Sequence, residues 1–277
     1  MTHEFTVSCL QTNSTSNLQD NMEQIEALME KAHAAGATLV ALPEACDFLH
    51  PDNAVMTAYA RPVAEHQALA RLSGLARKYG FWLLIGSLTV RHEKGSLANR
   101  SFLINADGAI VAHYDKIHMF DANIPGNKAT RESDLYHPGR QACLAETPWA
   151  MLGMTICYDL RFPHLYRSLA HAGAHILTVP AAFTKMTGEA HWHSLLKARA
   201  IENGCFILAP GQTGHHYEQR YSYGHSVIID PWGQVLADAG EEVGLITARI
   251  NLDKIAKARL IIGSLDHDRE FQPPQVS

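Results

Sequence analysis

The sequence has none of the features that carry a chain into a membrane or onto a nucleic acid. Its richest apolar run, residues 81–86, is far shorter than the ~18 residues that a membrane helix needs. The first ten residues contain neither the basic segment nor the long apolar segment of a secretory signal. Lysine and arginine number 23 against 28 acidic residues, without a basic patch or tail, whereas nucleic-acid-binding proteins usually carry one. We therefore expect a soluble cytoplasmic protein with no membrane or nucleic-acid partner.

Cysteine is scarce, and the five cysteines show no pairing pattern. They are Cys9, Cys46, Cys143, Cys157 and Cys205. An odd number of cysteines without short paired spacings argues against a disulfide framework and against a zinc site. We expect free thiols in a reducing compartment, and neither a metal nor a cofactor.

Glycine and proline, 19 and 12 of the 277 residues, are too few for a collagenous or low-complexity chain. The hydrophobic fraction of 47% is sufficient for a sizeable core. Because no internal repeat, charge block or linker marks a boundary, we predict a single domain over residues 1–277. Its core should span about residues 5–260, followed by a polar tail over 261–277.

Short apolar runs alternate with longer amphipathic stretches along most of the chain, which is typical of layered α/β structure. The first unit predicts a strand, a helix that Ser16 and Gln19 would begin as a capping box, and a second strand. Apolar runs on both sides of Asp107-Gly108 predict a β-hairpin. Hairpins combined with βα units favour mixed sheets over purely parallel ones. Residues 117–140 break the pattern, and so long a loop is usually functional.

Three polar residues stand at the carboxyl ends of predicted strands: Glu44, Lys116 and Cys157. In open α/β sheets, ligands bind in the crevice outside the carboxyl ends of the strands. The three residues would therefore converge if their strands are neighbours. Taken singly, each has an ordinary structural explanation, since a charged residue after a strand is usually a solvated turn and a cysteine is usually a small buried apolar residue.

Together the three residues form a chemically sensible set for acyl transfer through a thioester. A thiol with an ordinary pKa of ~8.5 needs a base or a nearby cation in order to react at neutral pH. Glu44, with its pKa raised by a water-poor pocket, would accept the proton and return it to a departing amine. Lys116 would favour the thiolate and stabilise the developing oxyanion, helped by the backbone N–H of Tyr158.

The segments around these residues resemble the three signature segments of the nitrilase superfamily of carbon-nitrogen hydrolases. They read Leu-Pro-Glu-Ala around Glu44, Tyr-Asp-Lys-Ile-His around Lys116 and Ile-Cys-Tyr-Asp-Leu-Arg-Phe-Pro around Cys157. The resemblance implies an α/β fold, a four-layer α-β-β-α sandwich with two mixed sheets. It also implies a homodimer in which sheet pairs with sheet, with the helix over 162–172 and the C-terminal segment as contact elements.

The same resemblance assigns roles to individual residues. It implies Cys157 as the nucleophile, Glu44 as general base and acid, and Lys116 as the cation of the site. It implies a second glutamate in the long loop, which by its position is Glu132, to hold the lysine and orient the substrate. Phe183, in the matching segment Pro-Ala-Ala-Phe, is a further expected residue of the substrate pocket.

Within the superfamily, residues 120–126 and 211–220 are similar to the deaminated glutathione amidase branch, and more distantly to the omega-amidases. This similarity implies hydrolysis of a small-molecule amide, the one that joins a 2-oxoglutaryl group to cysteinylglycine. The alternatives are an omega-amidase acting on 2-oxoglutaramate or another small dicarboxylic monoamide, and a non-catalytic binding module on the same fold. Two departures, Cys46 for the usual Phe and His164 for the usual Glu, are expected near the pocket. A thiol redox protein is disfavoured because no resolving cysteine lies close to Cys157 in the sequence.

Arg161 and the His215-His216 pair each have a functional and a structural explanation. Arg161 would bind a substrate carboxylate with two parallel hydrogen bonds, or it would pair with Asp159 or a helix end. His215 and His216 lie in a turn-rich segment, where they would be exposed to solvent or belong to a lid over the pocket.

His191 and His193 flank Trp192 in a predicted helix. Two histidines at this spacing can belong to a metal site, but no third ligand stands at a telling distance in the sequence. The pattern favours a helix surface around a packed Trp192.

Overall fold

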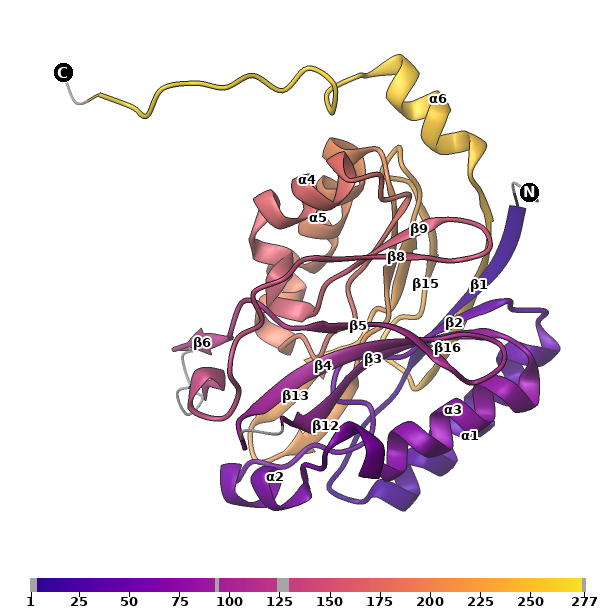
Figure 1. Ribbon diagram of the computed structural model, residues 1–277, viewed down its shortest axis with the longest axis vertical. Coiled ribbons are helices and arrows are strands. Elements are labelled where there is room, and N and C mark those ends of the chain that lie inside the picture. The colour runs from indigo at the N-terminus through magenta and orange to yellow at the C-terminus, as the bar shows by residue number, and fades with distance from the viewer. Residues whose placement is uncertain (1–3, 93–94, 124–129, 276–277) are drawn as a thin grey trace.

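The computed structural model describes residues 4–92, 95–123 and 130–275 and contains two six-stranded sheets stacked face to face (Figure 1). Helices cover the outer face of each sheet, which gives the four layers α-β-β-α. Side chains of both sheets share one hydrophobic core, in which Val7 and Leu103 of the first sheet lie with Leu177 and Ile207 of the second. This architecture confirms the predicted fold class.

The first sheet is mixed. Its three central strands run parallel and the others antiparallel to their neighbours. The strand order is β16 (Gly244–Asn251), β1 (Glu4–Gln11), β2 (Leu39–Ala41), β3 (Trp82–Arg91), β4 (Leu97–Ile104) and β5 (Ile110–Asp115). Because β4 is antiparallel to both β3 and β5, strand β5 ends at the same edge of the sheet as β2.

The second sheet repeats this plan, with parallel strands in its centre and antiparallel strands on both sides. Its order is β15 (Val235–Asp238), β14 (Val227–Ile229), β11 (Phe206–Ala209), β10 (Ile176–Thr178), β9 (Met151–Met154) and β8 (Cys143–Glu146). The two sheets therefore confirm the expectation of mixed sheets that the hairpin signals raised.

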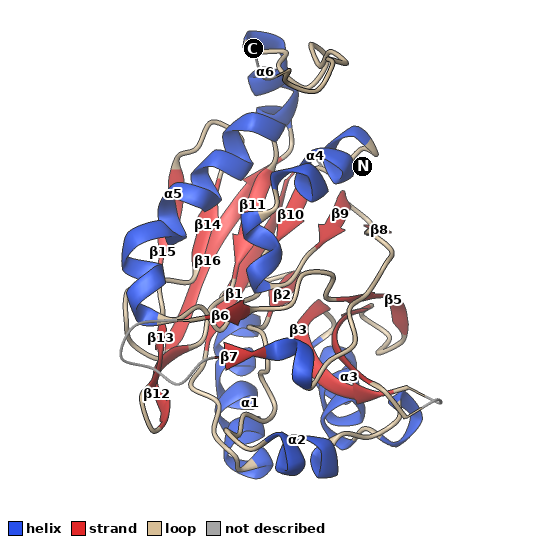
Figure 2. Ribbon diagram, turned by 90° about the vertical axis from the view of Figure 1, so that its left-hand side faces the viewer, coloured by secondary structure: helices blue, strands red, loops and turns tan. Residues whose placement is uncertain are grey.

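Two helices cover each sheet. Helices α1 (Leu18–Ala34) and α3 (Gln67–Tyr79) pack on the first sheet, and α4 (Pro163–His171) and α5 (Lys185–Asn203) lie over the second (Figure 2). The expected capping box at the start of α1 is wrong. Asn17 is the N-cap, and its side chain accepts from the N–H groups of Gln19 and Asp20, because an asparagine one residue closer satisfies the free N–H groups of the first turn.

The remaining elements are short and lie where the sequence showed little periodicity. The stretch over 211–220, expected to be rich in turns, forms most of a hairpin. These elements are α2 (Asn53–Tyr59), η1 (Val63–Glu65), β6 (Asp121–Ala122), β7 (Thr130–Arg131), η2 (Glu132–Asp134), η3 (Cys157–Arg161), β12 (Thr213–Tyr217), β13 (Arg220–Tyr223) and α6 (Asp253–Ile261). Part of the predicted loop over 117–140, residues 124–129, lies outside the described residues. In the part that the structure covers, no helix has the length and apolarity to span a bilayer.

The C-terminal segment carries more apolar surface than a polar tail would. It projects from the body of the molecule after α6 (Figure 1), and within residues 261–277 the side chains of Ile261, Ile262 and Phe271 are 58%, 59% and 88% exposed. Asp268 fastens the segment to α4 through Arg167 and His171.

A glycine in β3 permits the close approach on which the position of Glu44 depends. A Cβ atom added to Gly86 would lie 2.1 Å from the carbonyl oxygen of Leu42 and 2.3 Å from that of Pro43. These two residues immediately precede Glu44, so the absence of a side chain at position 86 fixes where the glutamate leaves the sheet.

We expect Gly86→Ala to lower kcat at least about tenfold, and to lower the free energy of unfolding by ~1–3 kcal/mol, because the chain before Glu44 must move away from the new methyl group. Steady-state kinetics and denaturant unfolding measure both effects. The matched control is Gly74→Ala in α3, where nothing lies within 4 Å; it should raise stability by ~0.5–1 kcal/mol with activity unchanged. Normal turnover in Gly86→Ala would contradict the inference that the close approach of Gly86 to Leu42 and Pro43 positions Glu44.

Candidate active site

The three residues found at predicted strand ends meet in one cavity. Glu44 follows β2, Lys116 follows β5 at the same edge of the first sheet, and Cys157 follows β9 in the facing sheet. All three line a cavity of about 860 Å³, together with Glu132 and Phe183. The stacking of the two sheets therefore joins chain segments more than a hundred residues apart.

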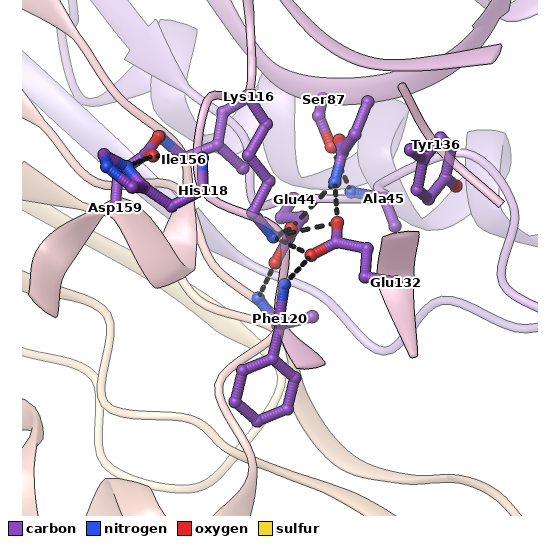
Figure 3. A network of polar contacts seen from close by, with 12 residues as sticks. Glu44, Ala45, Ser87, Lys116, His118, Phe120, Glu132, Tyr136, Ile156 and Asp159 are labelled. Atoms are coloured by element: carbon purple, nitrogen blue, oxygen red, sulfur yellow. Dashed lines mark hydrogen bonds and ion pairs between the residues drawn. The ribbon is translucent and has the colours of Figure 1, made fainter. Parts of the chain in front are cut away.

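Lys116 is the centre of the polar network in this cavity (Figure 3). Its Nζ lies 2.8 Å from Oε1 of Glu44 and 2.9 and 2.8 Å from the two carboxylate oxygens of Glu132. The lysine side chain is only 2% exposed, and those of the glutamates 7% and 11%. An ammonium buried so deeply requires such partners, because an unpaired buried charge is very costly.

Asn99, which no sequence pattern indicated, holds the two carboxylates at a fixed distance. Its Nδ2 donates to Oε1 of Glu44 and to Oε1 of Glu132, both at 3.0 Å. It lies on β4 opposite the chain that leaves β5, since the N–H of Lys116 donates to its carbonyl oxygen. Only the pairing of β4 with β5 places this amide beside Lys116.

Backbone groups complete the fixation of the carboxylates. The N–H of Ala182 donates to Oε2 of Glu44 at 2.8 Å, and the N–H of Phe120 donates to Oε2 of Glu132 at 2.6 Å. The amide of Gln212 donates to the carbonyl oxygen of Glu44 at 3.0 Å. Each glutamate is thus held in one orientation by partners from several segments.

The charges in the network stabilise one another against burial. Burial alone would raise the pKa of Glu44, but the charge of Lys116 and hydrogen bonds from Lys116, Cys157 and Ala182 lower it below its usual value. Burial would lower the pKa of Lys116, yet the carboxylates of Glu132 and Glu44 raise it well above its usual value. The raised pKa expected for Glu44 is therefore wrong, because the lysine outweighs the water-poor surroundings. Glu44 is therefore a carboxylate at neutral pH.

Cys157 stands on a strained turn, with a φ of 48° that few residues other than glycine adopt. Burial, followed by the charge of Glu44, raises the pKa of its thiol well above the usual value, although Lys116 acts in the opposite direction. The resting thiol is therefore protonated, contrary to the expectation that Lys116 favours a thiolate. Two carboxylates and one ammonium already give the site a net charge of −1, so a second uncompensated negative charge is unfavourable.

Asp159 supports the turn that carries the nucleophile. It is fully buried, and its carboxylate accepts from the hydroxyl of Tyr114 at 2.8 Å and from the N–H of Ile156 at 2.8 Å, with Nδ1 of His118 at 2.6 Å. The contact that the sequence offered as an alternative, a pair with Arg161, is not formed. Sequence spacing could not show the true partners of Asp159, because Tyr114 lies on β5 of the facing sheet and His118 follows that strand.

Of the other expected residues, Tyr158 and Phe183 line the cavity and Arg161 does not. The guanidinium of Arg161 lies over the rings of Phe183 and Tyr158, 5.3 and 6.0 Å from their centroids, and 3.4 Å from Nδ1 of His191. It therefore supports the wall of the cavity from behind.

The two departures from the signature segments, Cys46 and His164, also lie outside the cavity lining. Cys46 is fully buried, and the ring of His164 packs edge-on against Phe162. Both were expected near the pocket, but neither side chain reaches the cavity surface, because adjacency in sequence to a signature segment does not give a side chain access to the cavity.

The histidine pair in the hairpin is divided between two environments. His215 is exposed, whereas His216 is packed between the carbonyl oxygen of Ser14 and the hydroxyl of Ser222, both 2.8 Å from its ring nitrogens. Burial lowers the pKa of His216 to about 4, so this imidazole is neutral at pH 7. The hairpin tip over 217–221 forms part of the cavity wall.

Residues 6–260 match the family model described as carbon-nitrogen hydrolase. The chain belongs to the carbon-nitrogen hydrolase family. Curated relatives named deaminated glutathione amidase are 41% identical to it, over 95% of this chain in both cases. The protein from Synechocystis sp. is covered to 97% of its length and the one from Homo sapiens to 82%. With these relatives, this carbon-nitrogen hydrolase is an amidase.

Solved structures agree with this membership. The Nit-Fhit protein of C. elegans superposes with a TM-score of 0.90 at 36% identity, covering 96% of this chain and 65% of that one. A glutamate-to-glutamine variant of the amidase from Nesterenkonia sp. superposes with a TM-score of 0.79 at 25% identity, covering 96% of this chain and 94% of that one. In that variant, the acetamide moiety of fluoroacetamide is covalently attached to the active-site cysteine.

Replacing Asn99 by alanine should reduce kcat by roughly ten- to a hundredfold, since hydrogen bonds to charged groups are worth ~1.5–3 kcal/mol and both carboxylates lose one. Steady-state kinetics on the purified variant measures the loss. Asn17→Ala serves as control, because it removes a helix cap at a cost of ~1 kcal/mol of stability without touching the site. Equal turnover in the two variants would show that Asn99 does not position the glutamates.

The negative charge of Glu44 contributes to the raised pKa of the Cys157 thiol, and measurements of turnover alone cannot test this effect. In Glu44→Gln, the thiol of Cys157 should ionise at a lower pH than in the unmodified protein, because the neighbouring negative charge that raises its pKa is gone. The ultraviolet absorbance of the thiolate, followed against pH, measures the shift, and Cys157→Ala assigns the signal. A thiol pKa that is unchanged or higher in Glu44→Gln would refute the electrostatic account.

Proposed function

We propose that the amidase cleaves a linear amide through a thioester on Cys157, with Glu44 as general base and acid. The observation that carries this proposal is Glu44, hydrogen-bonded to Lys116 and lining the same cavity as Cys157. As the sulfur attacks the substrate carbonyl, the thiol proton passes to Glu44, so that the site keeps its net charge of −1. This transfer replaces a preformed thiolate.

The remaining steps follow from the same groups. The oxyanion of the tetrahedral intermediate is stabilised by Lys116 and by the N–H of Tyr158, which lies in the first turn of η3, where helix N–H groups lack an intrahelical partner. Glu44 then gives its proton to the departing amine, and the thioester remains. A water molecule that loses a proton to Glu44 hydrolyses the thioester, releasing the carboxylic acid and restoring the thiol. Glu132 holds Lys116 throughout.

We propose deaminated glutathione as the substrate, cleaved to 2-oxoglutarate and cysteinylglycine. The names of the relatives support this acyl group and this leaving group. The cavity supports it through its charge: Arg131 and Arg220 line it and donate to neutral oxygens, Arg220 to the carbonyl of Ala182. Their charges are therefore available to the carboxylates of a dianionic substrate.

The experiment compares kcat/KM for deaminated glutathione with kcat/KM for 2-oxoglutaramate. A preference for deaminated glutathione supports the proposal, and a clear preference for 2-oxoglutaramate would make the protein an omega-amidase. Arg220→Gln should raise KM for deaminated glutathione, which carries two carboxylates, with a smaller effect on kcat.

Turnover retained in Cys157→Ala would overturn the thioester mechanism. If the unmodified protein cleaved no amide in a panel of small dicarboxylic monoamides, a binding module on this fold would be favoured instead. The intact network of Glu44, Lys116 and Glu132 argues against that alternative.

We further propose a homodimer in a reducing, cytoplasmic compartment. The exposed Leu260 and Phe271 support an interface at the C-terminal segment, beside α4. The five free cysteines support the reducing compartment.

For the assembly, the double variant Leu260→Ser, Phe271→Ser should shift the protein towards the monomer in light scattering coupled to size exclusion, because burial of these side chains would drive association. Ile110→Ser, at an exposed apolar residue of β5, is the control and should leave the molar mass unchanged. A double variant with the molar mass of the unmodified protein would exclude this interface.

A further inference from the structure

Three side chains with metal-ligating atoms converge on the surface away from the catalytic cavity. They are His193 of α5, His225 between β13 and β14, and Asp238 at the end of β15. Their ligand atoms all lie within 4.8 Å of one another. Within residues 4–92, 95–123 and 130–275, this is the only group of three or more such side chains so close together.

The sequence could not reveal the third ligand. The sequence places His193 beside His191, across Trp192 on the same helix. The partners of His193 come instead from two segments that follow later in the chain. Nε2 of His193 lies 2.8 Å from Oδ2 of Asp238, and Nδ1 of His225 lies 2.9 Å from Oδ1 of the same carboxylate. The two imidazole rings are 5.2 Å apart and nearly perpendicular.

The ligands are held in place by neighbours that are not ligands themselves. The N–H of Gly240 donates to Oδ1 of Asp238 at 2.9 Å. The ring of His225 stacks on Tyr223 with centroids 4.4 Å apart, and its carbonyl oxygen accepts from the indole of Trp192 at 2.8 Å. His225 also has a φ of 52°, a conformation that persists in residues other than glycine only where the surroundings impose it.

Other contacts between histidine and carboxylate among the described residues lack the second imidazole. Asp268 binds His171 together with Arg167, and Asp159 binds His118 in the core together with Tyr114. Asp238, in contrast, accepts from two imidazoles, one on each carboxylate oxygen.

We propose that His193, His225 and Asp238 form a binding site for a divalent transition metal ion of the zinc, cobalt or nickel type. Nitrogen and carboxylate ligands favour these ions over calcium and magnesium, which prefer oxygen alone. In a tetrahedral site with bonds of ~2.0–2.1 Å, ligand atoms lie about 3.3 Å apart. Small rotations of side chains that are 23–31% exposed open the present distances of 2.8 and 2.9 Å to that value. The exposed side leaves the fourth position to water.

A metal here would join three segments that meet at the base of the cavity wall. His225 follows β13 after a single intervening glycine. The N–H of Tyr223, the last residue of β13, donates to the carbonyl oxygen of Phe183 at 2.9 Å. Phe183 and the tip of the β12–β13 hairpin both line the cavity. The ion would therefore stabilise the wall of the substrate pocket without touching the reacting groups.

The test uses Co²⁺ as the probe on the full chain, after treatment with a chelator. Co²⁺ bound here should give visible d–d absorption without the near-ultraviolet thiolate-to-cobalt band that binding at a cysteine would produce. It should also raise Tm as its concentration increases, since a ligand that binds only the folded state stabilises it.

His193→Gln and Asp238→Asn should each weaken Co²⁺ binding at least about tenfold, because even residues that merely support metal ligands are worth ~10- to 100-fold. His171→Gln is the matched control, since it removes an imidazole bound to a carboxylate at a place without a second imidazole. Circular dichroism confirms that the variants fold. The proposal is overturned if both variants keep the absorption and the Tm shift of the unmodified protein, or if that protein shows only the thiolate band.

Discussion

The buried ion pair network around Lys116 is the interaction on which the rest of the site depends. An ammonium that is 2% exposed between two carboxylates ties three parts of the chain together, the ends of β2 and β5 and the short helix η2. Removing one partner of such a network leaves an uncompensated buried charge, which typically costs ~3–5 kcal/mol. The geometry of the cavity and the protonation state of the nucleophile are both set by this one arrangement of charge.

The four-layer fold explains how so concentrated a charge is tolerated. The two sheets meet over an apolar core, and Glu44, Lys116 and Cys157 lie at the edge where β2, β5 and β9 end. Every carboxylate oxygen of Glu44 has a partner there, from Lys116, Asn99 or the N–H of Ala182. A fully satisfied network of this kind gives a single rigid arrangement, whereas a partly satisfied one would be less favourable than an apolar core.

Much of the fold, and the convergence of Glu44, Lys116 and Cys157 in one cavity, could be predicted from the sequence, because both depend on local patterns. Apolar runs ending in Glu44, Lys116 and Cys157 marked the carboxyl edge, and the signature segments identified their chemistry. The contacts of Asn99 and Asp159 could not be predicted, since they exist only after β4 pairs with β5 and the two sheets stack. The predicted direction of the pKa shift of Glu44 was wrong for the same reason, because the shift depends on Lys116, a cation that follows another strand.

A residue's place in a segment also proved a poor guide to what its side chain contacts. Arg161, Cys46 and His164 all adjoin catalytic segments yet lie outside the cavity lining, whereas His216 of a turn-rich stretch is packed and neutral. Sequence adjacency gives the position of the backbone, but the rotation of each strand or turn decides which side chains face the substrate. Such orientations follow from the packing of distant segments.

The protonated state of Cys157 has a consequence for the lifetime of the enzyme. Peroxides and other electrophiles react with thiolates rather than thiols, and a nucleophile that stays neutral until a carbonyl group arrives is a poor target for them. In the proposed mechanism, the same electrostatics that make proton transfer part of the attack therefore protect the sulfur of Cys157 against irreversible oxidation between turnovers.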